Sequence, residues 1–244
     1  MELFVETIAA HREALEQLSS KSQVIEWAQE QDNLGITLVN QSYRVSADQR
    51  PELVSKAVAA HKAAISVLSS ETHPLEWAKT QNNLGSSLQA KAGLEEAVDC
   101  SRSLDLAIKA HKAALSILDS GSSSDDRVRT LNNLATALLH LGSITHGQKG
   151  LELLNEAVRS FEALLDICTR ETHPLVWAVV QENIAQTTEA IVERGNADYR
   201  RSGLQRVLEL LDNAITIYAE VSDEHRLKEC SEHRTLVTQK LDNA

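Results

Sequence analysis

Apolar residues recur at spacings of three and four along almost the whole chain. Positions 57, 61, 64, 65 and 68, for example, carry Ala, His, Ala, Ile and Leu. This spacing lines one face of an α-helix, and polar residues fill the positions between. The pattern predicts ten helices, which we place at residues 3–19, 22–44, 51–69, 74–91, 95–119, 125–141, 148–169, 174–194, 201–220 and 223–241.

The same sequence blocks return every 50 residues. One block reads W-A-Q-E-Q-D-N-L-G from Trp27, W-A-K-T-Q-N-N-L-G from Trp77, R-V-R-T-L-N-N-L-A from Arg127 and W-A-V-V-Q-E-N-I-A from Trp177. A second block, such as A-A-H-K-A-A-I-S-V-L from Ala59, keeps the same period. Each repeat is therefore a pair of helices, and such a pair must stack on its neighbours to bury its apolar face.

Short signals mark where these helices should begin and end. In the E-T-H-P segments, Thr72 and Thr172 are expected to cap the next helix, with proline in its first turn. Gly93, Gly142 and Gly195 stand where the first helix of a pair should stop.

These observations predict an all-α fold, a right-handed α-solenoid of antiparallel helix pairs that forms a single domain over residues 1–244. Its repeats span about 22–71, 72–121, 122–171 and 172–221, with half-repeats at 1–21 and 222–244. The first helix lacks a preceding partner. Its apolar face near Leu3, Phe4 and Ile8 is expected either to be covered by the next helix or to contact another chain, which makes a homo-oligomer possible.

The blocks resemble the tetratricopeptide repeat, in its long form with W-A-x-x-Q-x-N-L-G segments. Leu34-Gly35 and Leu84-Gly85 are similar to the family's small pair on the first helix, and Ala57-His61-Ala64 is similar to the Ala, aromatic, Ala pattern on the second. The period of 50 and the histidine depart from the family's usual pattern. The resemblance implies a binding scaffold with a concave groove.

An asparagine recurs before the Leu or Ile of each block, at Asn33, Asn83, Asn133 and Asn183. Asparagine is a mediocre residue inside a helix, so four copies need a reason. In similar repeat proteins this asparagine binds the backbone of an extended peptide, a role that suits an amide because it carries both a donor and an acceptor. Alternatively, each asparagine satisfies polar groups between neighbouring repeats. The sequence leaves both interpretations open.

Helical spacing places further polar residues beside this asparagine ladder. The partner-binding candidates are Gln29, Lys79, Asn82, Ser86, Arg129, Asn132 and Thr136. Lys79 and Arg129 could hold the carboxylate of a peptide, or they could be two solvated charges on a helix surface.

A second ladder, of His11, His61 and His111, is best interpreted as packing, since successive repeats lie too far apart to share one metal ion. We expect no metal site and no cofactor. Enzyme motifs are missing: the G-S-I-T-H-G-Q-K-G segment from Gly142 only imitates a phosphate loop, because its Lys149 is one position late. We therefore expect a protein that is not an enzyme.

The balance of 35 acidic and 24 basic residues gives a net charge of −11, which disfavours nucleic acid and anionic membranes as partners. The sequence shows no targeting leader or long apolar run and predicts a cytoplasmic protein. The favoured function is an adaptor that binds an extended peptide or a partner helix in its groove. The alternative is a structural or regulatory module that self-associates or packs against a fused or partner effector domain.

Overall fold

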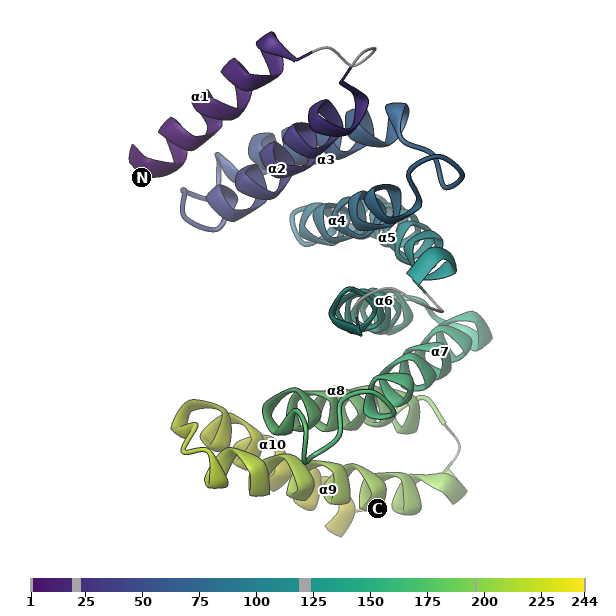
Figure 1. The fold of residues 1–244 in the computed structure, drawn as a ribbon. Coiled ribbons are helices and arrows are strands. Elements are labelled where there is room, and N and C mark those ends of the chain that lie inside the picture. The colour runs from purple at the N-terminus through teal and green to yellow at the C-terminus, as the bar shows by residue number, and fades with distance from the viewer. Residues whose placement is uncertain (1, 19–22, 119–123, 196, 244) are drawn as a thin grey trace. The chain divides into compact units, whose positions relative to one another are not determined.

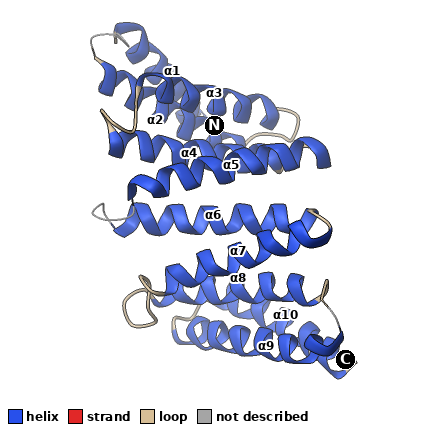
Figure 2. Ribbon diagram, turned by 90° about the vertical axis from the view of Figure 1, so that its right-hand side faces the viewer, coloured by secondary structure: helices blue, strands red, loops and turns tan. Residues whose placement is uncertain are grey.

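The computed structural model describes residues 2–18, 23–118, 124–195 and 197–243, with the side chains of 2–5, 124, 197 and 198 outside the description. These residues form ten helices and no strand (Figure 2). In chain order the helices are α1 (Glu2–Gln17), α2 (Val24–Ser42), α3 (Arg50–Val67), α4 (Pro74–Ala92), α5 (Ala97–Leu118), α6 (Ser124–Ile144), α7 (Gly147–Leu165), α8 (Pro174–Val192), α9 (Ala197–Glu220) and α10 (Glu224–Asp242). The fold is an all-α solenoid, as the repeat predicts.

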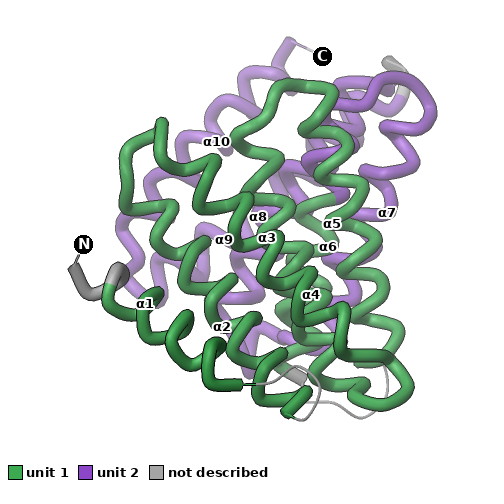
Figure 3. The backbone as a smooth tube through the Cα atoms, turned by 90° about the horizontal axis from the view of Figure 1, so that it is seen from above, with its two compact units in different colours: residues 1–137 green, residues 138–244 purple. Residues whose placement is uncertain are grey.

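The chain divides into two compact units, residues 1–137 and residues 138–244 (Figure 3). In the first unit, α1 packs on α2, α2 on α3 and α4 on α5, and α2 and α3 also contact α4. In the second unit, α7 packs on α8, α8 on α9 and α9 on α10. Helices α1 to α5 therefore pack on their neighbours in sequence, and so do α7 to α10, as Figure 1 allows the reader to follow.

Small residues bring the helices of a pair into close contact. The Gly35 backbone of α2 lies against the His61 ring of α3, and a Cβ at this glycine would sit 2.4 Å from the ring. Gly85 and His111 repeat the arrangement at 2.5 Å. The two imidazoles are fully buried, so His61 and His111 of the histidine ladder pack in the core as the sequence predicts.

Trp77 joins the cores of successive repeats. It packs against a cluster that contains Ala28 and Ala64, and also against one that contains Ala78 and Ala114. Burial of its large apolar surface at this junction stabilises the stacking of the two helix pairs.

Several predicted helix ends were wrong. His73 and His173, and not the threonines before them, stand at the N-caps of α4 and α8, while Pro74 and Pro174 open the helices as predicted. Thr72 instead bonds Ser69 in the preceding turn, with 2.8 Å between their hydroxyl oxygens.

Gly142 does not end α6, which continues to Ile144. A Cβ at Gly142 would lie 2.9 Å from the Leu154 side chain, so this glycine permits the close approach of α7. Helix α7 ends at Leu165, whereas the prediction placed its end at residue 169. Helix α9 begins at Ala197, whereas the prediction placed its start at residue 201.

Ile8 of α1 is buried against Leu34 and Leu38 of α2 and Ala57 of α3. The next helices therefore cover this part of the apolar face of α1. The side chains of Leu3 and Phe4, on which the prediction of a homo-oligomer also depended, lie outside the described residues.

Candidate functional site

The predicted site residues of the first unit follow one line along α2, α4 and α6. Helical spacing puts Gln29, Asn33 and Ile36 on one side of α2, and the equivalent residues of the next two repeats occupy the same register. We call the surface formed by these positions the ladder face: Gln29, Asn33, Ile36, Lys79, Asn83, Ser86, Arg129, Asn133 and Thr136. Gln29, Asn33, Ile36, Lys79 and Arg129 are exposed, and the others are half-buried.

Asn83 links two successive repeats. Its Nδ2 donates to Oδ2 of Asp32 at 2.8 Å, and Oδ1 of the same carboxylate lies 2.9 Å from Nδ1 of His61. One carboxylate on α2 thus holds a core imidazole on α3 and a ladder asparagine on α4. Because a carboxylate only accepts hydrogen bonds, the proton between Asp32 and His61 belongs to Nδ1.

Asn133 repeats this link one period later. Its Nδ2 lies 3.1 Å from Oδ1 of Asn82 and 3.1 Å from Oγ of Ser86. The Asn82 oxygen is also 3.0 Å from Nδ1 of His111, whose other ring nitrogen lies 3.1 Å from Oε1 of Gln89. Asn82 is 1% exposed, so it is buried behind the ladder face and contacts it through Asn133.

The two cations of the ladder face meet one carboxylate of the chain itself. Nη2 of Arg129 lies 2.7 Å from Oδ1 of Asp126, and Nζ of Lys79 lies 3.5 Å from Oδ2. Both cations keep about half of their side-chain surface exposed, at 53% and 51%. They are therefore oriented by Asp126 while still open to solvent.

The remaining candidates differ in their surroundings. Asn132 and Asn183 are half-buried, and their backbone oxygens accept hydrogen bonds from Thr136 and Thr187 at 2.9 Å and 2.7 Å. Asn183 belongs to the second unit and is described apart from the ladder face.

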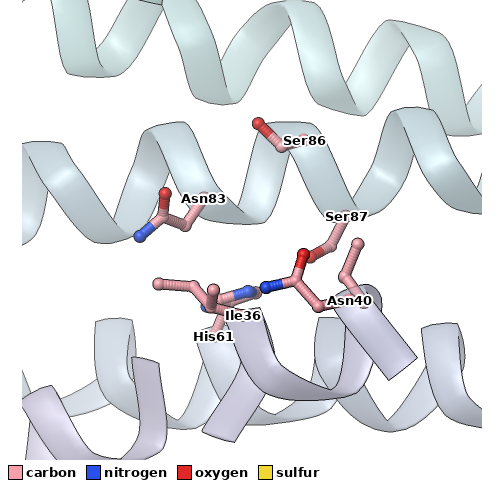
Figure 4. Close-up of a pocket in the computed structure, with 7 residues that line it drawn as sticks. Ile36, Asn40, His61, Asn83, Ser86 and Ser87 are labelled. Carbon is pink, nitrogen blue, oxygen red and sulfur yellow. The ribbon is translucent and has the colours of Figure 1, made fainter. Parts of the chain in front are cut away.

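An open pocket of about 160 Å³ lies between α2 and α4, beside Asn83 (Figure 4). Its lining combines two apolar side chains with hydroxyl, amide and imidazole groups: Ile36, Val39, Asn40, His61, Asn83, Ser86 and Ser87. Ser87 is 1% exposed, and its Oγ has no hydrogen-bond partner among the residues that the structure describes. A buried hydroxyl without a partner is costly, which marks this pocket as a place where a ligand could bind.

The second unit carries a more acidic pocket between α8 and α10. Its volume is about 480 Å³, and its lining is Glu182, Gln186, Glu189, Glu229, Glu232, His233 and Leu236. Glu189 lies 2.7 Å from His233 and 2.8 Å from Lys240, and the hydrogen bond with His233 is the largest of the effects that lower the pKa of Glu189 to about 2. The carboxylate is thus held by two side chains of the protein itself.

Sequence reasoning missed the residues that shape the pocket between α2 and α4. Asp32, Val39, Asn40 and Ser87 were absent from the predicted site, and His61 was interpreted only as packing. The sequence did contain a signal for this pocket: the residue one period after Val39 is Gln89, so the two repeats differ at this position. The consequence of that difference depends on side-chain contacts, which the repeat pattern does not contain.

No group of three or more His, Cys, Asp or Glu side chains that could hold a metal ion occurs in the described part of the chain. Within the same ranges, no helix combines the length and the apolar character needed to cross a bilayer.

Comparisons with known proteins add little to this picture. No protein-family model matches the chain, and no curated protein matches it either. Among solved structures, the chain is similar to a circular tandem repeat protein with novel repeat topology and enhanced subunit contact surfaces, with 17% identity and a TM-score of 0.45. The similarity covers 98% of this chain and 64% of that one.

Proposed function

We propose that this protein is a cytoplasmic, tetratricopeptide-like scaffold that binds an extended peptide of a partner protein on its ladder face and performs no catalysis. Helical repeats in general serve protein interaction, because stacked pairs present one continuous surface. The observation that carries the proposal is the pocket between α2 and α4, whose lining includes Ile36, Asn83 and Ser86 of the ladder face.

The chemistry of the ladder face suits a peptide. Amides and hydroxyls can pair with backbone N–H and C=O groups whatever the peptide's side chains are. Lys79 and Arg129 add exposed positive charge within a chain whose net charge is −11. Asp126 fixes their orientation, so little side-chain freedom is lost when a peptide carboxylate approaches.

The two interpretations of the asparagine ladder can both hold at different positions. Asn83 and Asn133 bond to the preceding repeat, while Asn33 is exposed and has no such bond among the described residues. We therefore assign peptide contact to Asn33, Gln29 and Ile36, and a mainly linking role to Asn83 and Asn133.

The proposal is tested with displayed random peptides. Peptides selected on the full chain are measured against two double variants, Asn33→Ala with Ile36→Ala on the ladder face, and Ser55→Ala with Lys62→Ala on exposed positions of α3. We expect the first variant to lose binding by about tenfold or more, since exposed anchors near a pocket carry most of the affinity. The second should bind like the parent chain.

Circular dichroism melts establish that both variants fold. Selected peptides that bind both variants as well as the parent would overturn the ladder face as the binding site. Selection that enriches no peptide would overturn peptide binding itself.

A second candidate function is self-association through the N-terminal end. A pocket of about 250 Å³ lies there, lined by Ile8, Ala9, Arg12, Leu38, Gln41, Leu53 and Lys56. Oε1 of Gln41 is buried in it without a hydrogen-bond partner among the described residues. Sedimentation velocity over a hundredfold range of concentration tests this candidate, which predicts a dimer that Ala9→Glu would dissociate.

A further inference from the structure

The first two repeat junctions of the chain differ in the residue that occupies the place of Gln89. On α4, Gln89 extends toward α5 and α6: its Oε1 lies 3.1 Å from Nε2 of His111, and its Nε2 donates to the backbone oxygen of Asn133 at 3.2 Å. A primary carboxamide therefore fills the space between a core histidine and a ladder asparagine at this junction.

One period earlier, the residue in the place of Gln89 is Val39, which carries no polar group. The histidine and the asparagine of this junction are His61 and Asn83, and both line the open pocket. Nε2 of His61 has no hydrogen-bond partner among the described residues, because the contact of the ring with Asp32 is made by Nδ1. The pocket thus lies where the next junction holds a carboxamide.

Ser87 makes the difference larger. Its equivalent one period later is Ala137, so the first junction has a buried hydroxyl where the second has only a methyl group. This hydroxyl lines the pocket and is unsatisfied (Figure 4). A buried O–H without an acceptor, beside a ring nitrogen without a partner, calls for a ligand group that both donates and accepts.

We propose that this pocket binds the primary carboxamide of a glutamine or asparagine side chain in the bound peptide. The inference rests on the proposed function and adds a specificity to it. The ligand NH₂ donates to Nε2 of His61 and to the backbone oxygen of Asn83, and its C=O accepts from the Ser87 hydroxyl.

A carboxamide suits the His61 ring, because its NH₂ donates to Nε2, the nitrogen that can accept when Nδ1 donates to Asp32. Carboxylates lack the donor, and aliphatic side chains lack both groups. The pocket has a volume of about 160 Å³, which is the volume that about five water molecules occupy in the liquid. The end of such a side chain therefore fits in it. Ile36 and Val39 cover its aliphatic stem.

The test uses three small probes in NMR titrations of the full chain: N-acetyl-glutamine methylamide, N-acetyl-methionine methylamide and N-acetyl-glutamate methylamide. We expect the glutamine probe to shift the amide signals of Asn40, Asn83 and Ser87 in a saturable way. The methionine and glutamate probes should bind at least about tenfold more weakly, as the loss of paired hydrogen bonds predicts.

The chain offers matched variants. Val39→Gln places the chain's own carboxamide in the pocket, as Gln89 does at the next junction, and should weaken the glutamine probe at least about tenfold. Gln89→Val should leave the first pocket unchanged and produce new probe-induced shifts near His111. Equal binding of the three probes, or undiminished binding to Val39→Gln, would overturn the proposal.

Ser87→Ala gives a second test in case Val39→Gln does not fold, since alanine already stands in this place at Ala137. It should weaken the glutamine probe several-fold and leave the methionine probe unchanged, whereas a merely structural serine would affect both probes alike. The peptides selected by display distinguish the failure of this inference from the failure of the proposed function. If they bind the ladder face but share no recurrent Gln or Asn, this inference is overturned and the proposed function stands.

Discussion

Asn83 of α4 donates a hydrogen bond of 2.8 Å to the carboxylate of Asp32 on α2, a residue 51 positions earlier in the chain. Asn133 makes the equivalent contact with Asn82, again 51 positions earlier. In both repeats the acceptor also contacts the core histidine 29 positions after it. Asn83 and Asn133 therefore each connect their repeat to the polar centre of the one before.

This contact predicts unequal effects of the same substitution. Asn83→Ala removes a donor from a carboxylate that is mostly buried, at 14% exposure of its side chain. We expect the free energy of unfolding to fall by about 1 kcal/mol, after the better helix propensity of alanine is counted. Asn33→Ala should be neutral or slightly stabilising, because it removes no such bond. Urea unfolding followed by circular dichroism measures both, and equal effects would argue against the link.

Gly85 provides a second matched pair of predictions. A Cβ at Gly85 would lie 2.5 Å from the buried His111 ring, so Gly85→Ala forces the ring or the helix to move. Overpacking of this kind costs about 1–3 kcal/mol. At Gly93, with φ −67°, the nearest atom would be 3.6 Å away, so Gly93→Ala should be neutral or stabilising. Thermal melts of the two variants compare them directly, and a Gly85→Ala chain as stable as the parent would refute the close contact.

The sequence predicted the helices and their pairing well because both depend on periodic patterns. Apolar spacing and the 50-residue period specify which helix faces are buried and which blocks are equivalent. The helix ends were less predictable. Gly142 has the usual signal for a stop, but the close approach of Leu154 is the reason for that glycine and the helix continues past it.

The ladder and its supporting contacts were only partly predictable. The sequence indicated that the asparagines matter, but it left two roles open. The hydrogen bonds of Asn83 to Asp32 and of Asn133 to Asn82 are the contacts that the linking role predicts. The pocket was not predicted at all, because it results from a departure from the repeat at Val39. A repeat pattern shows what successive units share, whereas specificity here arises where they differ.

Acid should destabilise the chain through His111. Burial of this ring lowers its pKa from the ordinary 6.5 to about 4. Between these values the unfolded chain binds a proton that the folded chain does not, so stability that is complete above pH 6.5 is lost as the pH falls toward 4. The full shift corresponds to about 3 kcal/mol.

Unfolding in urea at pH 7.0, 6.0, 5.0 and 4.5 measures this loss. The pKa of Glu189 is lowered from the ordinary 4.5 to about 2, so the stability that this carboxylate contributes is lost only as the pH falls from 4.5 toward 2. The effects of Glu189 and His111 therefore fall in different pH ranges and can be separated. A stability that stays constant from pH 7 to 5 would contradict the assignment to His111.

Asn82→Asp should convert the second polar centre into a copy of the first. The Asn82 oxygen already lies 3.0 Å from Nδ1 of His111 and accepts from Asn133, as Asp32 contacts His61 and accepts from Asn83. A carboxylate at this distance favours the charged ring, so the pKa of His111 should rise from about 4 toward its ordinary value.

An NMR titration of the His111 ring protons measures the rise in its pKa. The acid-induced loss of stability should shrink with it, because the folded chain then binds the proton at a higher pH. Asn132→Asp is the control: the residue 29 positions after it is Phe161, which has no ring nitrogen, so the pKa of His111 should not change. An unchanged pKa of His111 in Asn82→Asp would contradict the equivalence of the two polar centres.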